Sequence, residues 1–488
     1  MNISKYGIMA SLALSLGLLF YSCAPKSKLI EKLEELSADG TLDCQDLEQL
    51  TMYVQQNKED RSFKKLIKNG QADKIAIQNY MRKNANKAKL NIDQCGEVKT
   101  APTFAIYLEN SASMDGYVNG VSNFESVLSD ILIGLNYHYD KNNIKFNFIN
   151  SEIYPTEVTD VNTFFSSLEP GKPPFKVGNQ FVSELNQCFE KVLSETKDND
   201  VSIFVSDCIY SLGKGRSTQQ GLILEENMTK SAFMQRLKQS DLSTCILQFT
   251  SGFNGTYYDY NNQKTKLQQA ERPYYIWIIG ADNSVQNLLS KVRFTDMKGY
   301  QNSYFLKGNH GTEPSTQYLS GTNRIGRAVY RSQEPKDIKD IQFANGVFQY
   351  SIAADMSSFP DRKSILENRN YVLSPGATLV NVQEIPVNNQ STLIHQNDWQ
   401  RIKDNEFTHL ITVKVNQKKF PDELTIAYKN TIPSWVESSS NTDDSAISQT
   451  TQQTFGLRNL IHGVTEAYKT HNNNQDILFQ IKYNLAIK

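Results

Sequence analysis

The chain has 488 residues, with 51 lysines and arginines against 52 aspartates and glutamates, which gives a formal net charge of −1 at pH 7. A chain so close to neutrality offers no broad basic surface, so we expect no nucleic-acid partner. Hydrophobic residues make up 39% of the chain, which also holds 24 tyrosines and 24 phenylalanines, and this composition excludes an intrinsically disordered protein. The length is sufficient for two or three folded domains.

Residues 1–22 are typical of a secretory signal peptide. Lys5 precedes an apolar run that ends at Phe20, and this run is too short and too close to the start for a membrane span. Ser22 directly before Cys23 resembles the lipobox of bacterial lipoproteins, which implies that Cys23 carries a lipid anchor. Because neither an aspartate nor an acidic run follows Cys23, we expect attachment to the outer membrane, facing the periplasm. The alternative is an ordinary signal peptide with an incidental cysteine.

Residues 23–100 have the pattern of a small helical segment. Apolar residues recur at helical spacing over 29–36 and again over 47–54, on either side of an acidic turn that contains a glycine. The turn resembles an EF-hand calcium loop, but Glu35 and Asp46 stand where that loop has aspartate and glutamate, so we favour a plain helical hairpin. Cys44 and Cys95 bracket this segment, and we expect them to form a disulfide in an oxidising periplasm.

Residues 101–293 alternate between strand and helix patterns. Short apolar runs predict strands over 104–108, 144–148, 201–207, 245–249 and 275–279. Helical stripes lie between or after them, over 124–135, 181–192, 228–238 and 284–292. Ser122 and Glu125 predict a capping box at the start of the first helix. This alternation is typical of an α/β domain with a parallel sheet.

Acidic and hydroxyl side chains follow two of these predicted strands. Glu109 ends the first strand, Ser111 and Ser113 follow it at alternate positions, and Asp207 ends the strand that begins at Val201. Because ligands of α/β sheets bind outside the carboxyl ends of parallel strands, we expect these side chains to converge there. Such oxygen atoms are the ligands that hard divalent cations prefer.

The sequence Glu-x-Ser-x-Ser-Met over 109–114 resembles the Asp-x-Ser-x-Ser-Met signature of the von Willebrand factor A family, with Glu109 in place of the first aspartate. That family holds Mg²⁺ at a metal-ion-dependent adhesion site. The resemblance implies a doubly wound α/β sheet, with Gln180 or Asn179 in place of a threonine from a second loop. It implies that the metal ligands are Glu109, Ser111, Ser113, Gln180 and Asp207. Such a site leaves one metal position for an acidic group of a partner, so it implies a binding module and not an enzyme.

Two other classes of function are alternatives. A hydrolase could use Glu109 and Asp207 as a carboxylate pair, but the chain has no Gly-x-Ser-x-Gly motif and no histidine in a recognisable catalytic position. A carbohydrate-binding surface lipoprotein could offer stacking faces from the tyrosines at 257, 258, 260, 274 and 275. Buried core tyrosines are the simpler interpretation of this cluster.

Residues 294–488 are rich in strand patterns. Alternating apolar residues predict strands over 347–353, 378–385, 407–415, 424–428 and 477–487, and one helix carries an apolar stripe over 457–464. We expect a β-rich, sandwich-like C-terminal domain. The polar stretch 438–453 lacks apolar periodicity and is predicted to be a mobile loop. Taken together, the sequence predicts a lipid-anchored envelope lipoprotein that acts as a protein-interaction or assembly module, with Mg²⁺ as its candidate cofactor.

Overall fold

The computed structural model describes residues 28–37, 40–68, 71–85, 89–90, 102–120, 122–180, 184–197, 199–212, 217–240, 242–308, 313–331, 335–357, 359, 362–386, 393–403 and 407–487. The chain divides into two compact units, Met1–Thr100 and Ala101–Lys488. The predicted signal peptide over 1–22, the predicted lipidation residue Cys23 and the predicted disulfide partner Cys95 lie outside the described residues. Within the described ranges, no helix is both long enough and apolar enough to cross a membrane.

The first unit contains short helices around a small hydrophobic core. Its helices are α1 (Lys28–Leu36), α2 (Cys44–Gln56) and α3 (Lys74–Asn84), with a 3₁₀ turn over Arg61–Leu66 and the short strands β1 (Thr41–Leu42), β2 (Ile67–Lys68), β3 (Gln71–Ala72) and β4 (Lys89–Leu90). Asp43 and Asp46 form a capping box at the start of α2. The acidic turn therefore caps a helix, as expected for a helical hairpin. Cys44 is disulfide-bonded.

The second unit is built on a seven-stranded sheet with the strand order β11-β9-β10-β8-β5-β6-β7. Its strands are β5 (Phe104–Glu109), β6 (Ile144–Ile149), β7 (Ile153–Thr156), β8 (Val201–Ser206), β9 (Ser243–Tyr258), β10 (Lys264–Gly280) and β11 (Tyr300–Lys307). Strand β5 is parallel to both β6 and β8. The pairs β6–β7, β8–β10, β9–β10 and β9–β11 are antiparallel. The unit is therefore mixed α/β.

The sheet is not parallel throughout, which corrects the expectation for residues 101–293. The strands predicted over 245–249 and 275–279 are the inner parts of β9 and β10, which are joined by a short turn into one long hairpin. A short turn can connect only antiparallel strands, because a parallel connection needs a crossover of a dozen or more residues. The apolar runs alone do not distinguish these two connections.

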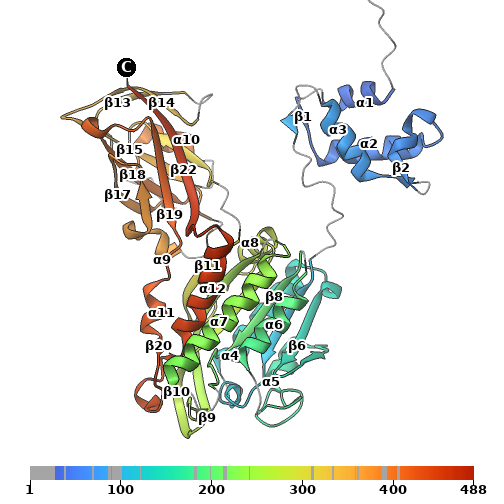
Figure 1. The fold of residues 1–488 in the computed structure, drawn as a ribbon, viewed down its shortest axis with the longest axis vertical. Helices are drawn as coiled ribbons and strands as arrows, with labels where there is room; N and C mark the ends of the chain where they lie inside the picture. The colour runs from blue at the N-terminus through green and yellow to red at the C-terminus, as the bar shows by residue number, and fades with distance from the viewer. Residues whose placement is uncertain are drawn as a thin grey trace, which may run out of the picture. The chain divides into compact units, whose positions relative to one another are not determined.

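Helices cover both faces of this sheet (Figure 1). Helices α4 (Asn123–His138), α5 (Val161–Ser166) and α8 (Asp282–Lys291) contribute to the hydrophobic core with Phe104, Ile106 and Leu108 of β5. Helices α6 (Leu185–Glu195), α7 (Thr218–Leu237) and α12 (Leu457–His471) pack on the other face, against Tyr107. Ser122 is the N-cap residue of α4, but its hydroxyl donates to the Tyr117 carbonyl at 2.8 Å, so the predicted capping box with Glu125 does not form.

The remaining strands form two further sheets. The four-stranded sheet has the order β12-β15-β18-β17 and the five-stranded sheet the order β13-β14-β22-β19-β16. Their bounds are β12 (Thr316–Leu319), β13 (Arg327–Tyr330), β14 (Asp337–Gln342), β15 (Val347–Ala354), β16 (Tyr371–Leu373), β17 (Ala377–Glu384), β18 (His409–Asn416), β19 (Glu423–Lys429) and β22 (Ile477–Ile487). Short helices α9 (Arg362–Ile365) and α10 (Gln396–Ile402) accompany them. Inward side chains of both sheets, such as Tyr350, Ile411 and Ile481, belong to one buried cluster.

The predicted domain boundary at residue 293 falls inside the second unit. Strand β11 lies beyond it and is an edge strand of the seven-stranded sheet. Helix α12 comes from still later in the chain and packs on that sheet through Leu460, Ile461 and Val464. Residues 101–488 therefore behave as one compact unit with interleaved segments.

The stretch 438–453, predicted to be a mobile loop, is an ordered part of the fold. We call residues 438–454 the clasp. It follows α11 (Ser434–Ser438) and contains β20 (Ser440–Asn441) and a 3₁₀ turn over Ile447–Gln449, and β20 pairs in parallel with β21 (Thr454–Phe455). Asp444 and Ile447 are buried. The prediction failed because the polar side chains of the clasp find their hydrogen-bond partners on the distant β9–β10 hairpin.

Candidate functional site

Strands β5 and β8 bring the predicted site residues to one edge of the sheet. The two strands are adjacent and parallel, with Phe104 opposite Val201 and Leu108 opposite Val205. Every residue of both strands is buried. Since parallel strands end on the same side, Glu109 and Asp207 lie at the same edge, as the sequence predicted.

We call Glu109, Ser111, Ser113 and Asp207 the strand-end cup. The Ser206 hydroxyl donates to the Glu109 carboxylate and links the ends of the two strands. The hydroxyl oxygens of Ser111 and Ser113 lie 3.0 Å apart. The Asp207 carboxylate accepts a hydrogen bond from the backbone N–H of Ile209 at 3.4 Å. Both carboxylates are buried, so their charges interact through a medium of low dielectric constant.

Gln180 approaches the strand-end cup from a separate loop. Its side-chain amide donates to the Asn110 carbonyl at 3.0 Å, and its backbone carbonyl accepts from the Ala112 N–H at 3.0 Å. Gly178 begins this turn with a φ of +69°, and a Cβ atom there would lie 2.3 Å from the Tyr154 hydroxyl. The turn therefore requires glycine, and it fixes Gln180 against the loop that carries the two serines.

A buried asparagine pair holds these loops together, and sequence reasoning did not single it out. Asn110 donates to the carbonyls of Phe175 at 2.8 Å and Val177 at 2.9 Å. Asn150 donates to the Asn110 side-chain oxygen and to the Val177 carbonyl, both at 2.9 Å. The available signal was that each asparagine directly follows a strand, β5 or β6, at neighbouring positions of the parallel pair.

Three residues of the strand-end cup line a pocket of about 280 Å³, and the fourth, Asp207, is buried behind its lining. Glu109, Ser111, Ser113 and Gln180 form one side, and the tip of the β9–β10 hairpin forms another with Tyr258 and Tyr260 among its residues. Polar and aromatic groups therefore meet in one concave site, which is the usual composition of a binding pocket.

The tyrosine cluster gives little support to carbohydrate stacking. Tyr257, Tyr274 and Tyr275 are almost completely buried. The Tyr258 ring has the Lys264 ammonium 5.5 Å from its centroid, and the Tyr260 ring stacks on Phe455 at 5.5 Å. Most aromatic faces of the cluster are thus already used within the fold.

The electrostatics of the cup are dominated by its two acids. Burial and then the neighbouring charge of Glu109 raise the pKa of Asp207 above its usual range. The Arg272 guanidinium and a hydrogen bond from Ser113 act in the opposite direction. The next residue, Cys208, has a φ of +56°, a strained conformation of the kind that clusters at functional sites.

The cup has donors that suit a hard divalent cation. A cation between the two buried carboxylates would offset their mutual repulsion, and the hydroxyls of Ser111 and Ser113 lie beside them as further ligands. In the part of the chain that the structure describes, no group of three or more histidine, cysteine, aspartate or glutamate side chains could hold a metal ion. A cation in the cup would therefore depend on two carboxylates and on the weaker oxygens of Ser111, Ser113 and Gln180.

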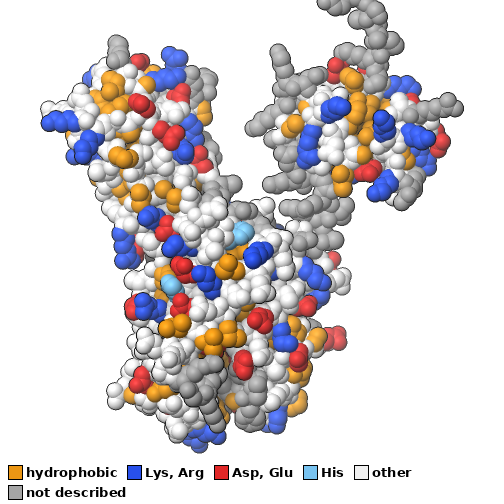
Figure 2. Space-filling model, in the orientation of Figure 1, with side chains coloured by type: hydrophobic (Ala, Val, Ile, Leu, Met, Phe, Trp, Pro, Cys, Tyr) orange, Lys and Arg blue, Asp and Glu red, His pale blue; other side chains and the backbone are white. Residues whose placement is uncertain are grey.

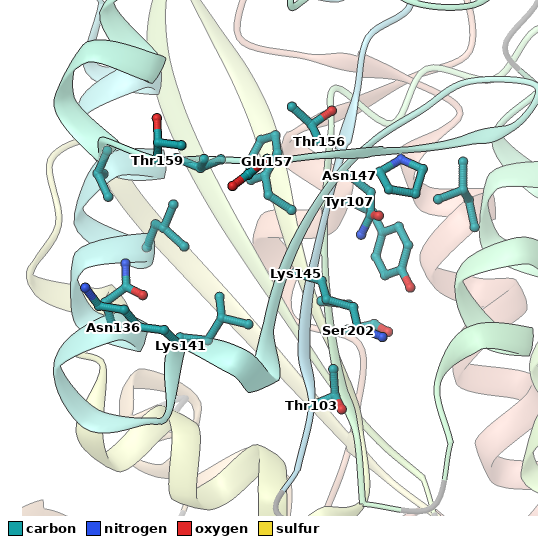
Figure 3. Close-up of a pocket in the computed structure, with 18 of the residues that line it drawn as sticks. Thr103, Tyr107, Asn136, Lys141, Lys145, Asn147, Thr156, Glu157, Thr159 and Ser202 are labelled. Atoms are coloured by element: carbon teal, nitrogen blue, oxygen red, sulfur yellow. The ribbon is translucent and has the colours of Figure 1, made fainter.

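A larger pocket of about 1150 Å³ lies near the opposite ends of the parallel strands, around the first residues of β6. Figure 3 shows Tyr107, Asn147 and Ser202 on one side of it and Asn136 with Lys141 on the other. Its buried polar groups serve the fold, because Asn147 donates to the Ile106 carbonyl at 3.2 Å. Burial raises the pKa of Tyr107 to about 12, so this phenol is neutral at physiological pH. We therefore take the cup as the candidate site.

Comparison of the chain with protein-family models, with curated proteins and with solved structures found no match.

Proposed function

We propose that residues 101–488 form a von Willebrand A-like protein-binding module, which contacts its partner at the strand-end cup. The observation that carries this proposal is the parallel pairing of β5 with β8, which gathers the residues of the family signature at one sheet edge. The order β7-β6-β5-β8, with an antiparallel edge strand and helices on both faces, adds support. The antiparallel β9–β10 hairpin and Glu109 in place of aspartate are departures from the family pattern.

The two smaller sheets are the second part of the proposed module. We infer that they form a β-sandwich, because their inward side chains belong to one buried cluster. Helix α10 covers part of the other face of the four-stranded sheet, where Ile402 packs with Leu319 and Leu410. The clasp and α12 lie between β19 and β22 in the sequence and contact the seven-stranded sheet, so they connect this part covalently to that sheet. A partner held at the cup would thus act on one continuous unit.

Mg²⁺ is the proposed cofactor of the cup. Glu109, Ser111, Ser113, Gln180 and Asp207 are the residues that would hold it. Its charge would offset the repulsion between the two buried carboxylates, and it would present a positive centre to an acidic group of the partner. Because ligand binding stabilises the folded state by mass action, Mg²⁺ or Mn²⁺ should raise the melting temperature of wild type and not that of Asp207→Ala.

The proposed address is the outer membrane, with a lipid on Cys23 and the protein facing the periplasm. The apolar run that ends in Ser22-Cys23 supports this proposal. The disulfide bond of Cys44 also supports it, because disulfides persist in oxidising compartments. On the face shown in Figure 2, acidic and basic side chains are interspersed, which suits a protein partner better than a polyanion.

The test is affinity capture from detergent-solubilised envelopes with the full-length protein as bait. The variants are wild type, the double substitution Ser111→Ala with Ser113→Ala, and Ser290→Ala, which changes an exposed serine on α8 as a matched control. We expect the same specific protein with wild type and with Ser290→Ala, and its loss with the double variant. Recovery of that protein by all three baits would contradict the cup as the contact site. A parallel capture with chelator decides whether the contact requires the cation.

A further inference from the structure

Arg272 is a buried arginine on β10, close to the strand-end cup. Tyr275 of β10 pairs with Ser206, the last residue of β8. Continuing this antiparallel register places Asp207 beside Tyr274, and Arg272 lies two residues further along β10 on the same face as Tyr274. Its side chain is completely shielded from solvent. A positive charge therefore lies in the interior, on the same side of the sheet as the Asp207 carboxylate.

Arg272 has few partners for its five N–H donors, and the Tyr117 phenol is one of them. The guanidinium carbon lies 4.5 Å from the centroid of the Tyr257 ring and 5.8 Å from that of Phe253. Its Nη1 donates to the Thr451 carbonyl of the clasp at 3.3 Å. Nε and Nη2 are buried without a hydrogen-bond partner among the described residues. Hydrogen bonding alone therefore does not explain why an arginine occupies this position.

The positive charge of Arg272 interacts with the charged groups around it. A buried cation is costly unless an opposite charge compensates for it. The charges of Asp207 and Arg272 attract each other, whereas Glu109 repels Asp207. One guanidinium thus offsets part of the repulsion between the two acids of the cup and lets both stay in the same buried site.

We propose that Arg272 is a built-in counter-cation of the strand-end cup, which competes with divalent metal ions for the Glu109–Asp207 pair. This inference rests on the proposed function only in taking the cup as the cation site. The competition is electrostatic, since a fixed positive charge nearby lowers the affinity of the cup for any further cation. Arg272 is a positioning residue, because it acts through Asp207 and not by touching the ligand.

The test is Mn²⁺ binding to the full-length protein in detergent, measured by isothermal titration calorimetry. We compare wild type with Arg272→Gln, which removes the charge, Arg272→Lys, which keeps it, and Asp207→Asn, which removes the acid. We expect Arg272→Gln to bind Mn²⁺ about tenfold more tightly than wild type, which is the reverse of what damage to the fold would cause. Arg272→Lys should stay within about threefold of wild type, and Asp207→Asn should lose the binding.

Each result decides the matter. If Arg272→Gln binds Mn²⁺ no more tightly than wild type, or if neither protein binds it, the proposal is wrong. If wild type does not bind Mn²⁺ but Arg272→Gln does, the proposal for Arg272 stands. The proposed function then loses its cation, and the affinity-capture experiment still tests whether the partner binds at the cup. If Arg272→Gln does not fold, Arg272→Met replaces it with an uncharged side chain of similar length. If both neutral variants unfold, Arg272→Lys with wild-type stability and Mn²⁺ affinity supports the role of the charge, and an unfolded or non-binding Arg272→Lys overturns it.

Discussion

Replacing Asn110 by alanine should destabilise the second unit substantially, because this side chain joins three segments in a site without water access. Asn110 is completely buried and makes three side-chain hydrogen bonds, to the Phe175 and Val177 carbonyls and from the Asn150 amide. Each such bond contributes about 1 kcal/mol net, and leaving its partner unpaired adds a desolvation cost. We therefore expect Asn110→Ala to lower the free energy of unfolding by about 3 to 4 kcal/mol.

Equilibrium unfolding in urea, followed by tryptophan fluorescence, measures this loss, since Trp277 is buried within the same sheet. Asn119→Ala is the matched control, because Asn119 makes one exposed hydrogen bond, to the Asn254 carbonyl at 2.7 Å. The control should lose about 0.5 kcal/mol or less. If Asn110→Ala loses no more than the control, the reasoning about the asparagine pair is refuted.

Three other outcomes follow from the sequence and the structure. Cys23→Ser should release the protein from the membrane fraction, and continued fatty-acid labelling of that variant would contradict the lipid anchor. Mass spectrometry of unreduced peptides should show Cys44 linked to Cys95, and a different partner for Cys44 would overturn this pairing. Burial raises the pKa of Glu125 to about 7, above an unfolded value of about 4.3, so its native state binds the proton more tightly and stability falls as the pH rises from about 4 to about 7. Glu125→Gln should thus be about 1 kcal/mol more stable than wild type at pH 8 and equal to it near pH 4. This magnitude is smaller than the full pKa shift would give, because Glu125 is only half-buried and solvent screens its charge. A stability difference that does not change with pH would refute this prediction.

Local patterns in the sequence predicted the elements that position the cup. The apolar run at Phe104 and the run at Val201 each form a fully buried strand, and the helical stripe that begins at Phe124 forms α4. Their periodicity is sufficient because each element buries a face that its own residues define. The acid at the end of each strand then follows directly, which is why the sequence alone placed Glu109 and Asp207 at the ends of neighbouring strands.

Features that depend on distant pairing were not predictable in the same way. Asp444 accepts hydrogen bonds from the Tyr257 hydroxyl at 2.5 Å and from the Tyr260 N–H at 3.0 Å, across more than 180 residues of sequence. Nothing near Asp444 distinguishes this clasp from a solvated loop. Arg272 is similar, because arginine is almost never fully buried and only the aromatic residues of the neighbouring strand reveal its place.

The path of the chain through the second unit has a consequence for how the protein is made. Strand β22 (Ile477–Ile487) lies between β14 and β19 in the five-stranded sheet, and α12 covers the seven-stranded sheet shortly before it. Domains that fold during synthesis or export do so when their last interior element has emerged. Neither part of this unit can close before the final tenth of the chain is available, so the unit should stay largely unfolded until its synthesis is nearly complete. A ribosome that stops after residue 450 would release a product with exposed apolar faces and no route to the native state, a substrate for chaperones and proteases.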